Sequence, residues 1–284
     1  MTRVHRGSWA ALWVILVLAC AFVGAPAKAA CPTLPARHLS ATDARAFART
    51  VENALAGSGA KVAIVFRVGL PPGDMPKDML FSHGGLWVRV SDGGPDYQTF
   101  NLYQGDGRRL RCDRSDLVED TPEGFFTGSV TPPRAAVLIP TAEMQTRLLA
   151  LVHAPAYAAL HNPDYSLMAN PFERKHQNCT DFLLRLVVAA RLDITNADRI
   201  DATIRREFKP TDVKLNPLVR TFGSVIDSRL VLDDQHGAIE TATFASLADY
   251  MRAKGLLAEA PSYVQLPVAA QWCCRPVQQP AGFP

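Results

Sequence analysis

The sequence predicts an α+β fold built around a mostly antiparallel sheet. Residues 40–57 repeat apolar side chains at helical spacing. Two β-rich runs lie on either side of Asp-Gly-Gly-Pro at 92–95, a pattern typical of a β-hairpin. The apolar stretch that begins at Cys179 predicts a helix buried on nearly every face, which needs a sheet on one side and helices on another.

The first half of the chain predicts a helix, a strand and the hairpin, in that order. The helix is expected to be capped by Thr42 and to end at Gly57. Its apolar repeat is Phe47, Val51 and Leu55. Residues 61–69 are short, apolar and β-branched and predict a buried strand, and the Pro- and Gly-rich residues after them predict a loop. The hairpin follows, from "FSHGGLWVRV" to "YQTFNLYQ".

The second half is expected to contain mostly helices. A strand is predicted over 135–140 and a helix over 141–154, whereas residues 154–177 have no apolar period and predict a long loop. The Cys179 helix is expected to extend to Leu192. The remaining expected elements are a helix over 195–208 capped by Thr195, a strand over 225–237 and a helix over 243–257.

The N-terminal residues 1–29 have the three parts of a secretory signal peptide. Two arginines precede a short apolar run, which ends in small residues with an A-x-A cleavage pattern. We therefore expect an exported, periplasmic protein, with one domain over 30–264 and a tail over 265–284. Cleavage before Cys20, which would give a lipid-anchored protein, is the second alternative.

The charge balance argues against a nucleic-acid partner. Without residues 1–29, 27 Lys and Arg stand against 27 Asp and Glu, so the basic excess belongs to the expected signal peptide. No later stretch is apolar and long enough to predict a membrane span. We expect no cofactor.

Five cysteines remain after the expected cleavage, an odd number that leaves one thiol over in an exported protein. Cys31, Cys112, Cys273 and Cys274 can form two disulfides. A bond between Cys31 and the Cys273–Cys274 pair is the first guess, because chain ends often lie close together. Cys179 and Cys112 compete for the role of free thiol. No C-x-x-C pair is present, which argues against a zinc knuckle.

Cys179 is expected in the first turn of its helix. Asn178 is a good N-cap, and Asp181 three positions on resembles a capping box. Unpaired N–H groups and the positive end of the helix dipole would then surround the thiol and lower its pKa. The same N–H groups could hold an oxyanion. The alternatives are a buried packing residue or one half of a disulfide.

A cysteine nucleophile needs a base, and the base needs an orienting group. His83 starts an apolar strand, and the Gly84-Gly85 pair after it leaves room for another backbone or a substrate. A buried structural histidine is the alternative for His83. The other histidines after the expected signal peptide, predicted in loops or at a helix end, are His38, His153, His161, His176 and His236.

The hairpin offers two amides as the orienting group. If it turns at residues 93–94, His83 lies opposite roughly Gln104, and Asn101 is one diagonal step away. Either side chain could fix the tautomer of the imidazole. Polar strand residues that face water are the alternative for both.

"FSHGGLW", the hairpin to "TFNLYQ", and the later "NCTDFLL" together resemble the circularly permuted branch of the NlpC-like, papain-like thiol hydrolases. In that branch the strand histidine precedes the cysteine helix. The resemblance implies an antiparallel sheet packed on a buried cysteine helix, and it places Asn101 at the third position of the site. Asp181 replaces the usual Glu. Over roughly residues 40–260, the chain is also similar to the bacterial domain-of-unknown-function family 2145.

These observations favour a thiol hydrolase or acyltransferase that acts on an amide or an ester. Cys179 would be the nucleophile and His83 the base, with Asn101 or Gln104 orienting it. The resemblance implies a peptidoglycan peptide as substrate, with a lipid or protein acyl group as the alternative. A non-catalytic envelope protein that binds a ligand or partner on the same scaffold is the second hypothesis. A metal site of His83, Cys179 and His176 lacks a fourth ligand and is not expected.

Overall fold

A computed structural model describes residues 39–70, 75–77, 79–91, 94–104, 114–227, 229–259, 261–264 and 275–276 of the chain. The chain divides into two compact units, Met1–Ala30 and Cys31–Pro284, and all described residues belong to the second. The expected signal peptide lies outside the described residues, as does most of the tail. The four cysteines of the expected disulfides, Cys31, Cys112, Cys273 and Cys274, also lie outside them.

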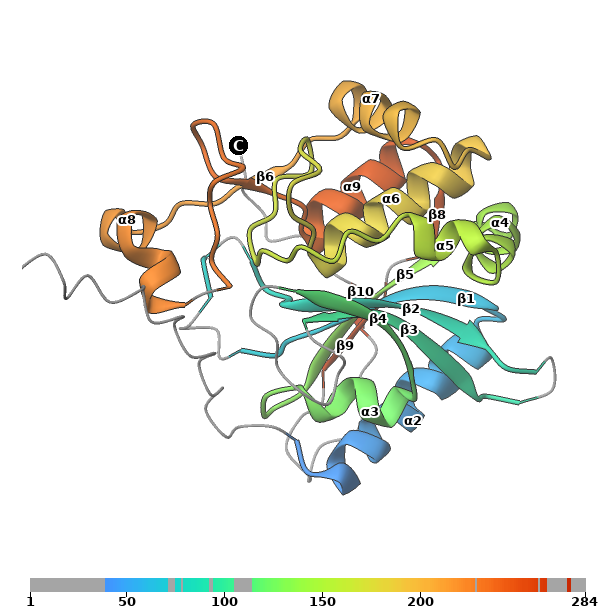
Figure 1. The fold of residues 1–284 in the computed structure, drawn as a ribbon. Helices are drawn as coiled ribbons and strands as arrows, with labels where there is room; N and C mark the ends of the chain where they lie inside the picture. Colours follow the sequence, from blue (N-terminus) through green and yellow to red (C-terminus); the bar gives the residue numbers. More distant parts are fainter. Residues whose placement is uncertain are drawn as a thin grey trace, which may run out of the picture. The chain divides into compact units, whose positions relative to one another are not determined.

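The centre of the described structure is an antiparallel sheet, which confirms the α+β class (Figure 1). Its strand order is β10-β9-β5-β1-β2-β3-β4, and β8 pairs with β5. The strands are β1 Val62–Arg67, β2 His83–Arg89, β3 Tyr97–Gln104, β4 Ser115–Asp120, β5 Arg134–Pro140, β8 Leu257–Glu259, β9 Pro261–Val264 and β10 Arg275–Pro276. The expected hairpin is β2–β3.

Helices cover both faces of the sheet (Figure 1). The helices α2 (Ala41–Gly57) and α3 (Pro122–Thr127) lie on one face. On the other face are α4 (Ala142–Val152), α6 (Cys179–Leu192) and α9 (Phe244–Ala253). The remaining elements are α5 Pro155–Ala159, α7 Ala197–Glu207, α8 Pro217–Ile226, and a ladder of β6 Thr211–Asp212 with β7 Glu240–Thr241. None of the helices in the described ranges is long and apolar enough to cross a membrane.

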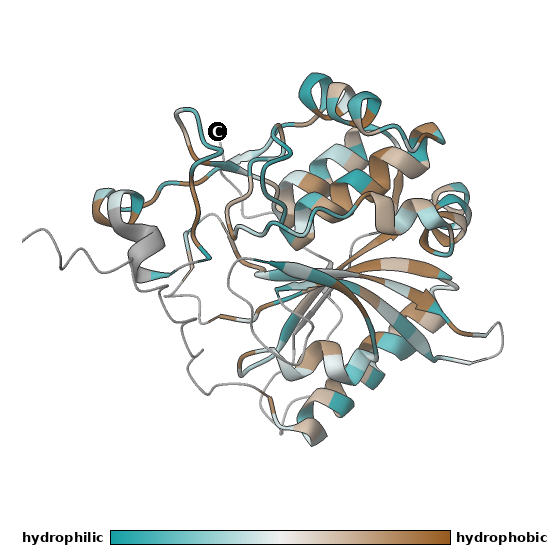
Figure 2. Ribbon diagram, in the orientation of Figure 1, coloured by the Kyte–Doolittle hydropathy of each residue, from teal (hydrophilic) through white to brown (hydrophobic). Residues whose placement is uncertain are grey.

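Alternation along the strands divides the apolar residues between two cores. Leu86 and Val88 of β2 join the cluster that packs against α6, whereas Trp87 joins the cluster with α2 and α3. Figure 2 shows hydrophobic residues along the strands and along α6, as expected for a sheet covered on both faces. The two cores therefore lie on opposite faces of the same sheet, and each buried apolar strand residue packs into one of them.

The structure corrects the expected helix starts. The first helix is capped by Ser40 instead of Thr42, because the Ser40 side chain accepts from the N–H of Asp43. The cap of α7 is Asn196 instead of Thr195. In both segments a second good capping residue lies within two positions of the expected one, and the sequence alone does not choose between them.

The expected strand over 225–237 is wrong. Its first residues finish α8, and no strand pairing involves the rest of the segment within the described residues. Its apolar residues Leu230 and Leu232 instead fill a small third cluster with Met168 and Val213. The expected loop over 154–177 contains the short helix α5. Several short elements, β4 and α3 among them, were not predicted, because their runs of apolar residues are too short to show a period.

Candidate functional site

Helix α6 begins at Cys179 and ends at Leu192, as predicted. Asn178 is its N-cap: the side-chain Oδ1 accepts from the N–H of Thr180 at 3.0 Å and of Asp181 at 2.9 Å. The expected capping box is incomplete, because the Asp181 carboxylate does not bond back to the cap. It accepts instead from Gln177 at 3.3 Å and Arg185 at 2.9 Å. The Asn178 cap thus occupies two of the N–H groups that were expected to hold an oxyanion.

Cys179 is a free cysteine, and the residue is 7% exposed. Burial raises the pKa of its thiol, so the expected lowering is wrong. The backbone N–H of Gly84, the hydroxyl and N–H of Thr180, and the charge of Arg67 all favour the thiolate, but burial outweighs them. Cys179 is therefore a neutral thiol at neutral pH, surrounded by groups that would stabilise its ionised form.

Gly84 brings strand β2 into direct contact with α6. A Cβ at this position would lie 2.5 Å from Phe66 Cε1 and 2.9 Å from Leu183 Cδ1, both inside the core. Only a glycine allows this approach, which puts the Gly84 N–H against the Cys179 sulfur. The first glycine of the Gly84-Gly85 pair thus allows the backbone of β2 to pack closely against α6.

Replacing Gly84 with alanine is expected to lower the free energy of unfolding by about 1–3 kcal/mol, since the added methyl group overpacks a closed core. Urea unfolding of the purified protein measures this. Gly57→Ala is the matched control, because nothing lies within 4 Å of a Cβ there. A Gly84→Ala protein as stable as Gly57→Ala would contradict the close approach.

The ring of His83 points to the opposite face of the sheet from Cys179. Gly84 faces α6, so His83 faces α3, where its ring stacks on Tyr103 with centroids 4.7 Å apart and lies 5.4 Å from the Phe125 ring. Its Nε2 is buried without a partner, and no hydrogen bond joins the ring to Cys179 within the described residues. The structure brings both residues to the start of β2, but not into contact.

Burial holds the pKa of His83 well below its ordinary value, and the nearby Arg67 charge lowers it further. The amide of Asn101 acts in the opposite direction. The imidazole is therefore neutral at neutral pH and a weaker base than an exposed histidine. Cys179 and His83 are therefore both uncharged, and they do not form a thiolate–imidazolium ion pair.

Of the two predicted orienting amides, the structure puts one near His83. The register pairs Gly85 with Asn101, and continuing it puts Tyr103 across from His83, one residue away from the expected Gln104. Gln104 therefore points to the other face and cannot orient His83. Asn101 is fully buried, and its Nδ2 donates to Thr99 Oγ1 at 2.9 Å. Its Oδ1 lies over Gly85, the second glycine of the pair.

Arg67 was missed from the sequence. It pairs with His83 across β1–β2, and its guanidinium lies over the Phe125 ring, 5.6 Å from the centroid, and donates to the carbonyl of Gly128. Among the described residues no carboxylate forms an ion pair with it. Its charge disfavours the imidazolium of His83 and favours the thiolate of Cys179. An arginine that ends an otherwise apolar strand was the available signal.

Cys179 forms part of the wall of a cavity of about 340 Å³, which was also not predicted. Most of the wall is apolar, and the Tyr165 side chain contributes a hydroxyl group. Burial raises the pKa of Tyr165, so its hydroxyl remains a hydrogen-bond donor. The cavity gives the thiol a hollow, open to solvent on one side, in which a ligand could meet it.

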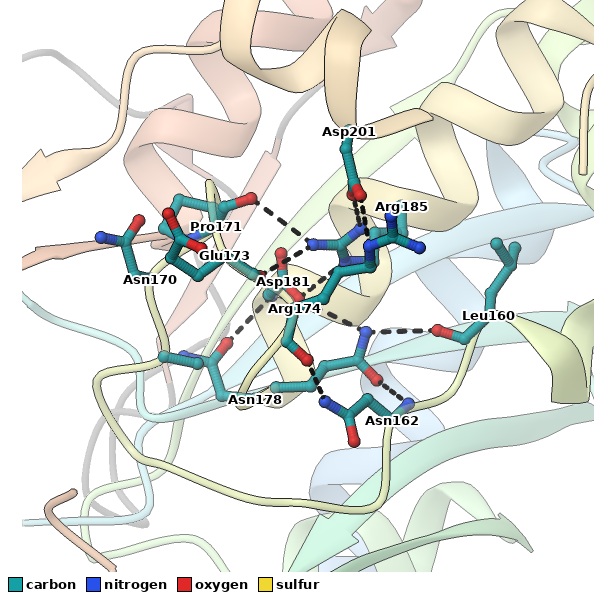
Figure 3. Close-up of polar contacts among 12 residues, drawn as sticks. Leu160, Asn162, Asn170, Pro171, Glu173, Arg174, Asn178, Asp181, Arg185 and Asp201 are labelled. Atoms are coloured by element: carbon teal, nitrogen blue, oxygen red, sulfur yellow. Dashed lines mark hydrogen bonds and ion pairs between the residues drawn. The ribbon is translucent and has the colours of Figure 1, made fainter. Parts of the chain in front are cut away.

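A charged network anchors the other side of the α6 start (Figure 3). The Arg185 guanidinium binds Asp181 at 2.9 Å and Asp201 at 2.5 Å, and Arg174 binds Asp201 at 2.6 Å. Arg185 also donates to the carbonyl of Glu173 at 3.3 Å. The network ties the loop before Cys179 to α6 and α7, and it borders a second cavity of about 490 Å³.

The remaining histidines have other partners. His161 Nε2 lies 3.0 Å from Ser115 Oγ, and His176 Nε2 lies 2.7 Å from a carboxylate oxygen of Asp233. His38 lies outside the described residues. Within the described residues, no group of three or more His, Cys, Asp and Glu side chains could hold a metal ion, and His176 is not joined to Cys179.

One of three comparisons with known proteins identifies a family. Neither the curated proteins nor the solved structures searched give a match. A family profile matches residues 54–251, a span that contains Cys179, His83, Asn101 and Arg67. Since the match covers more than half of the chain, the chain belongs to the family described as "Uncharacterized protein conserved in bacteria (DUF2145)".

Proposed function

We propose that this protein is an exported thiol hydrolase or acyltransferase that acts on an amide or an ester, with Cys179 as its nucleophile. The observation that supports this best is a free thiol at a helix start that forms the wall of a cavity. The sulfur also meets N–H and O–H groups from Gly84 and Thr180 that favour the thiolate. A circularly permuted papain-like arrangement is part of the proposal.

In the proposed reaction His83 takes the thiol proton as the sulfur attacks the carbonyl carbon. The bond to the leaving oxygen or nitrogen then breaks, and the leaving group receives the proton from His83. Water, or a second nucleophile in a transferase, releases the acyl group from the sulfur. The His83 ring faces the other side of the sheet from Cys179, so this role requires the start of β2 to rearrange when substrate binds and to bring the imidazole within reach of the thiol.

The oxyanion of this reaction needs hydrogen-bond donors beside the sulfur. The backbone N–H of Cys179 has no partner among the described residues, whereas the next two N–H groups are taken by Asn178. The hydroxyl of Tyr165, in the same cavity wall, is the second donor in this proposal. This assignment replaces the pair of helix N–H groups that the sequence suggested.

The second candidate is a non-catalytic envelope protein that binds its ligand in the same cavity. Two observations favour it: the raised pKa of Cys179 and the lack of a hydrogen bond to His83. In this case the thiol is a packing residue of the cavity wall. The two candidates differ in whether Cys179 reacts in the folded protein.

The test is alkylation of the folded full-length chain with iodoacetamide across pH, with Cys179 followed by peptide mass mapping. The thiolate is the reactive form and burial raises the pKa. The rate should therefore still rise at pH values where an ordinary cysteine has levelled off. Arg67→Gln removes a charge that favours the thiolate, so it should move the midpoint higher still.

His83→Gln should slow alkylation of Cys179 at neutral pH, because it removes the base. His236→Gln is the control, since that side chain is 73% exposed. If Cys179 reacts only after unfolding, or if all variants share one pH profile, the hydrolase proposal fails and the binding protein becomes the better account.

A further inference from the structure

We propose that the cavity beside Cys179 takes an uncharged, apolar acyl group, so that the substrate is an acyl ester, thioester or amide with a hydrocarbon chain. This inference rests on the proposed function and names its substrate class. It excludes the charged peptide that the sequence resemblance implied. The argument uses the composition of the cavity wall, the state of its charges, and its size.

The wall is apolar and comes from several separate parts of the chain. Its apolar side chains include Leu70, Met79, Phe81, Leu167, Met168 and Leu230. Met168 and Leu230 also form the third hydrophobic cluster, so they continue into a packed core. A hydrocarbon chain in this space would remove apolar surface from water along most of the wall. The three methionines of the wall, Met75 among them, can adapt to chains of different shape.

The only charges in the described part of the wall neutralise each other. Asp227 and Arg229 form a two-pronged pair, with Arg229 Nε 2.8 Å from Oδ1 and Nη2 2.6 Å from Oδ2 of Asp227. Each side chain is mostly buried, at 21% and 11% exposed. A charged substrate group would have to break this pair or stay unpaired, and both are costly away from water.

The polar groups of the wall are arranged around the thiol or already have partners. Asn178 caps α6 with its Oδ1, and its Nδ2 donates to the Leu167 carbonyl at 3.1 Å. Ser82 Oγ accepts from the N–H of Gly69 at 2.7 Å. The hydroxyl group of Tyr165 remains for a ligand, and that of Thr180 lies 3.9 Å from the Cys179 sulfur. The reacting carbonyl therefore has polar neighbours, whereas the rest of the acyl group meets hydrocarbon.

The size of the cavity suits a single hydrocarbon chain more than a segment of a polymer such as peptidoglycan. At about 340 Å³ it lies near the lower end of the range for small-molecule sites. Each methylene group that enters should improve kcat/KM by up to about fourfold, the ratio that corresponds to 0.8 kcal/mol per buried CH₂. The gain should stop when the chain fills the cavity. A dependence on chain length is thus the signature of this site.

The experiment compares p-nitrophenyl esters from acetyl to dodecanoyl on the full-length protein, with a D-alanyl ester as the charged competitor. We expect kcat/KM to rise along the series and then level off. Met79→Glu puts a charge into the wall and should flatten the rise. Leu80→Glu is the matched control, because Leu80 is 49% exposed and is not part of the wall. A preference for the acetyl or the D-alanyl ester overturns the inference.

A binding measurement separates this inference from the proposed function. The uncharged dye N-phenyl-1-naphthylamine is titrated into Cys179→Ala and displaced by alkyl amides of increasing length. Displacement that strengthens with length, without ester turnover by the unsubstituted protein, supports the apolar site and rejects the enzyme. Turnover without any dependence on length supports the enzyme and rejects the apolar site. Leu230→Asn, with unfolding followed in parallel, provides a second wall variant if Met79→Glu does not fold.

Discussion

Replacing Arg185 with methionine is expected to lower the free energy of unfolding by about 3–5 kcal/mol. Arg185 is only 5% exposed, and it neutralises the carboxylates of Asp181 and Asp201, which are 0% and 8% exposed. Without the guanidinium, the Asp181 carboxylate loses its cation and stays buried beside Asp201, which keeps only its pair with Arg174. Equilibrium unfolding in urea measures the loss as a lower midpoint at an unchanged slope.

Two comparisons show whether this loss comes from the buried charges. Arg252→Met removes an exposed pair with Asp249, with side chains 55% and 74% exposed, and should cost less than about 1 kcal/mol. Adding Asp181→Leu to Arg185→Met removes the carboxylate that is left buried without a cation and should recover part of the stability. If Arg185→Met is no more costly than Arg252→Met, the network does not hold α6 in place.

The network also connects stability to the candidate site. Arg185 donates to the carbonyls of Pro171 and Glu173, in the loop that leads to Cys179. Gln177, at the end of that loop, donates to both Asp181 and the carbonyl of Leu160. The first turn of α6 is thereby fixed from the side away from the thiol, so the position of Cys179 depends on charges that do not touch it.

The sequence was sufficient where the signals are local. The Asn178 cap and the apolar run after it predict α6 to the residue, and the glycines near 93–94 predict the β2–β3 hairpin. Both depend on residues close together in the chain. The strand expected over 225–237 fails because pairing needs a partner elsewhere, and here the apolar residues pack against Met168 instead.

The site was less predictable, because its chemistry depends on which face of the sheet each strand residue occupies and on how deeply Cys179 and His83 are buried. An error of one residue in the hairpin register exchanges Gln104 for Tyr103 beside His83, since alternate residues face opposite sides. The position of Cys179 in the first turn of the helix predicts a lowered pKa. Segments distant in the sequence bury the thiol, and this burial raises the pKa instead. Arg67 acts only through residues that the fold brings to it.

Replacing Cys179 with alanine is expected to reduce hydrolysis of an octanoyl ester by about 10³-fold or more, because the covalent step needs the sulfur. His83→Gln should cost about 10²–10⁴-fold, the contribution of a general base. Thr180→Ala removes a hydroxyl 3.9 Å from Sγ and should have a smaller effect. The measurement is kcat/KM for each variant, together with its unfolding midpoint.

The stability readout distinguishes a nucleophile from a packing residue. Cys179→Ala removes one buried atom and should cost only about 1 kcal/mol, so the protein stays folded while turnover is lost. His83→Gln disturbs a ring that stacks on Tyr103, so its effect on the rate counts only if the midpoint is kept. A folded Cys179→Ala protein that retains turnover would show that the thiol belongs to the cavity wall alone. The neutral thiol and imidazole predict that activity, where present, rises with pH through the raised pKa of Cys179.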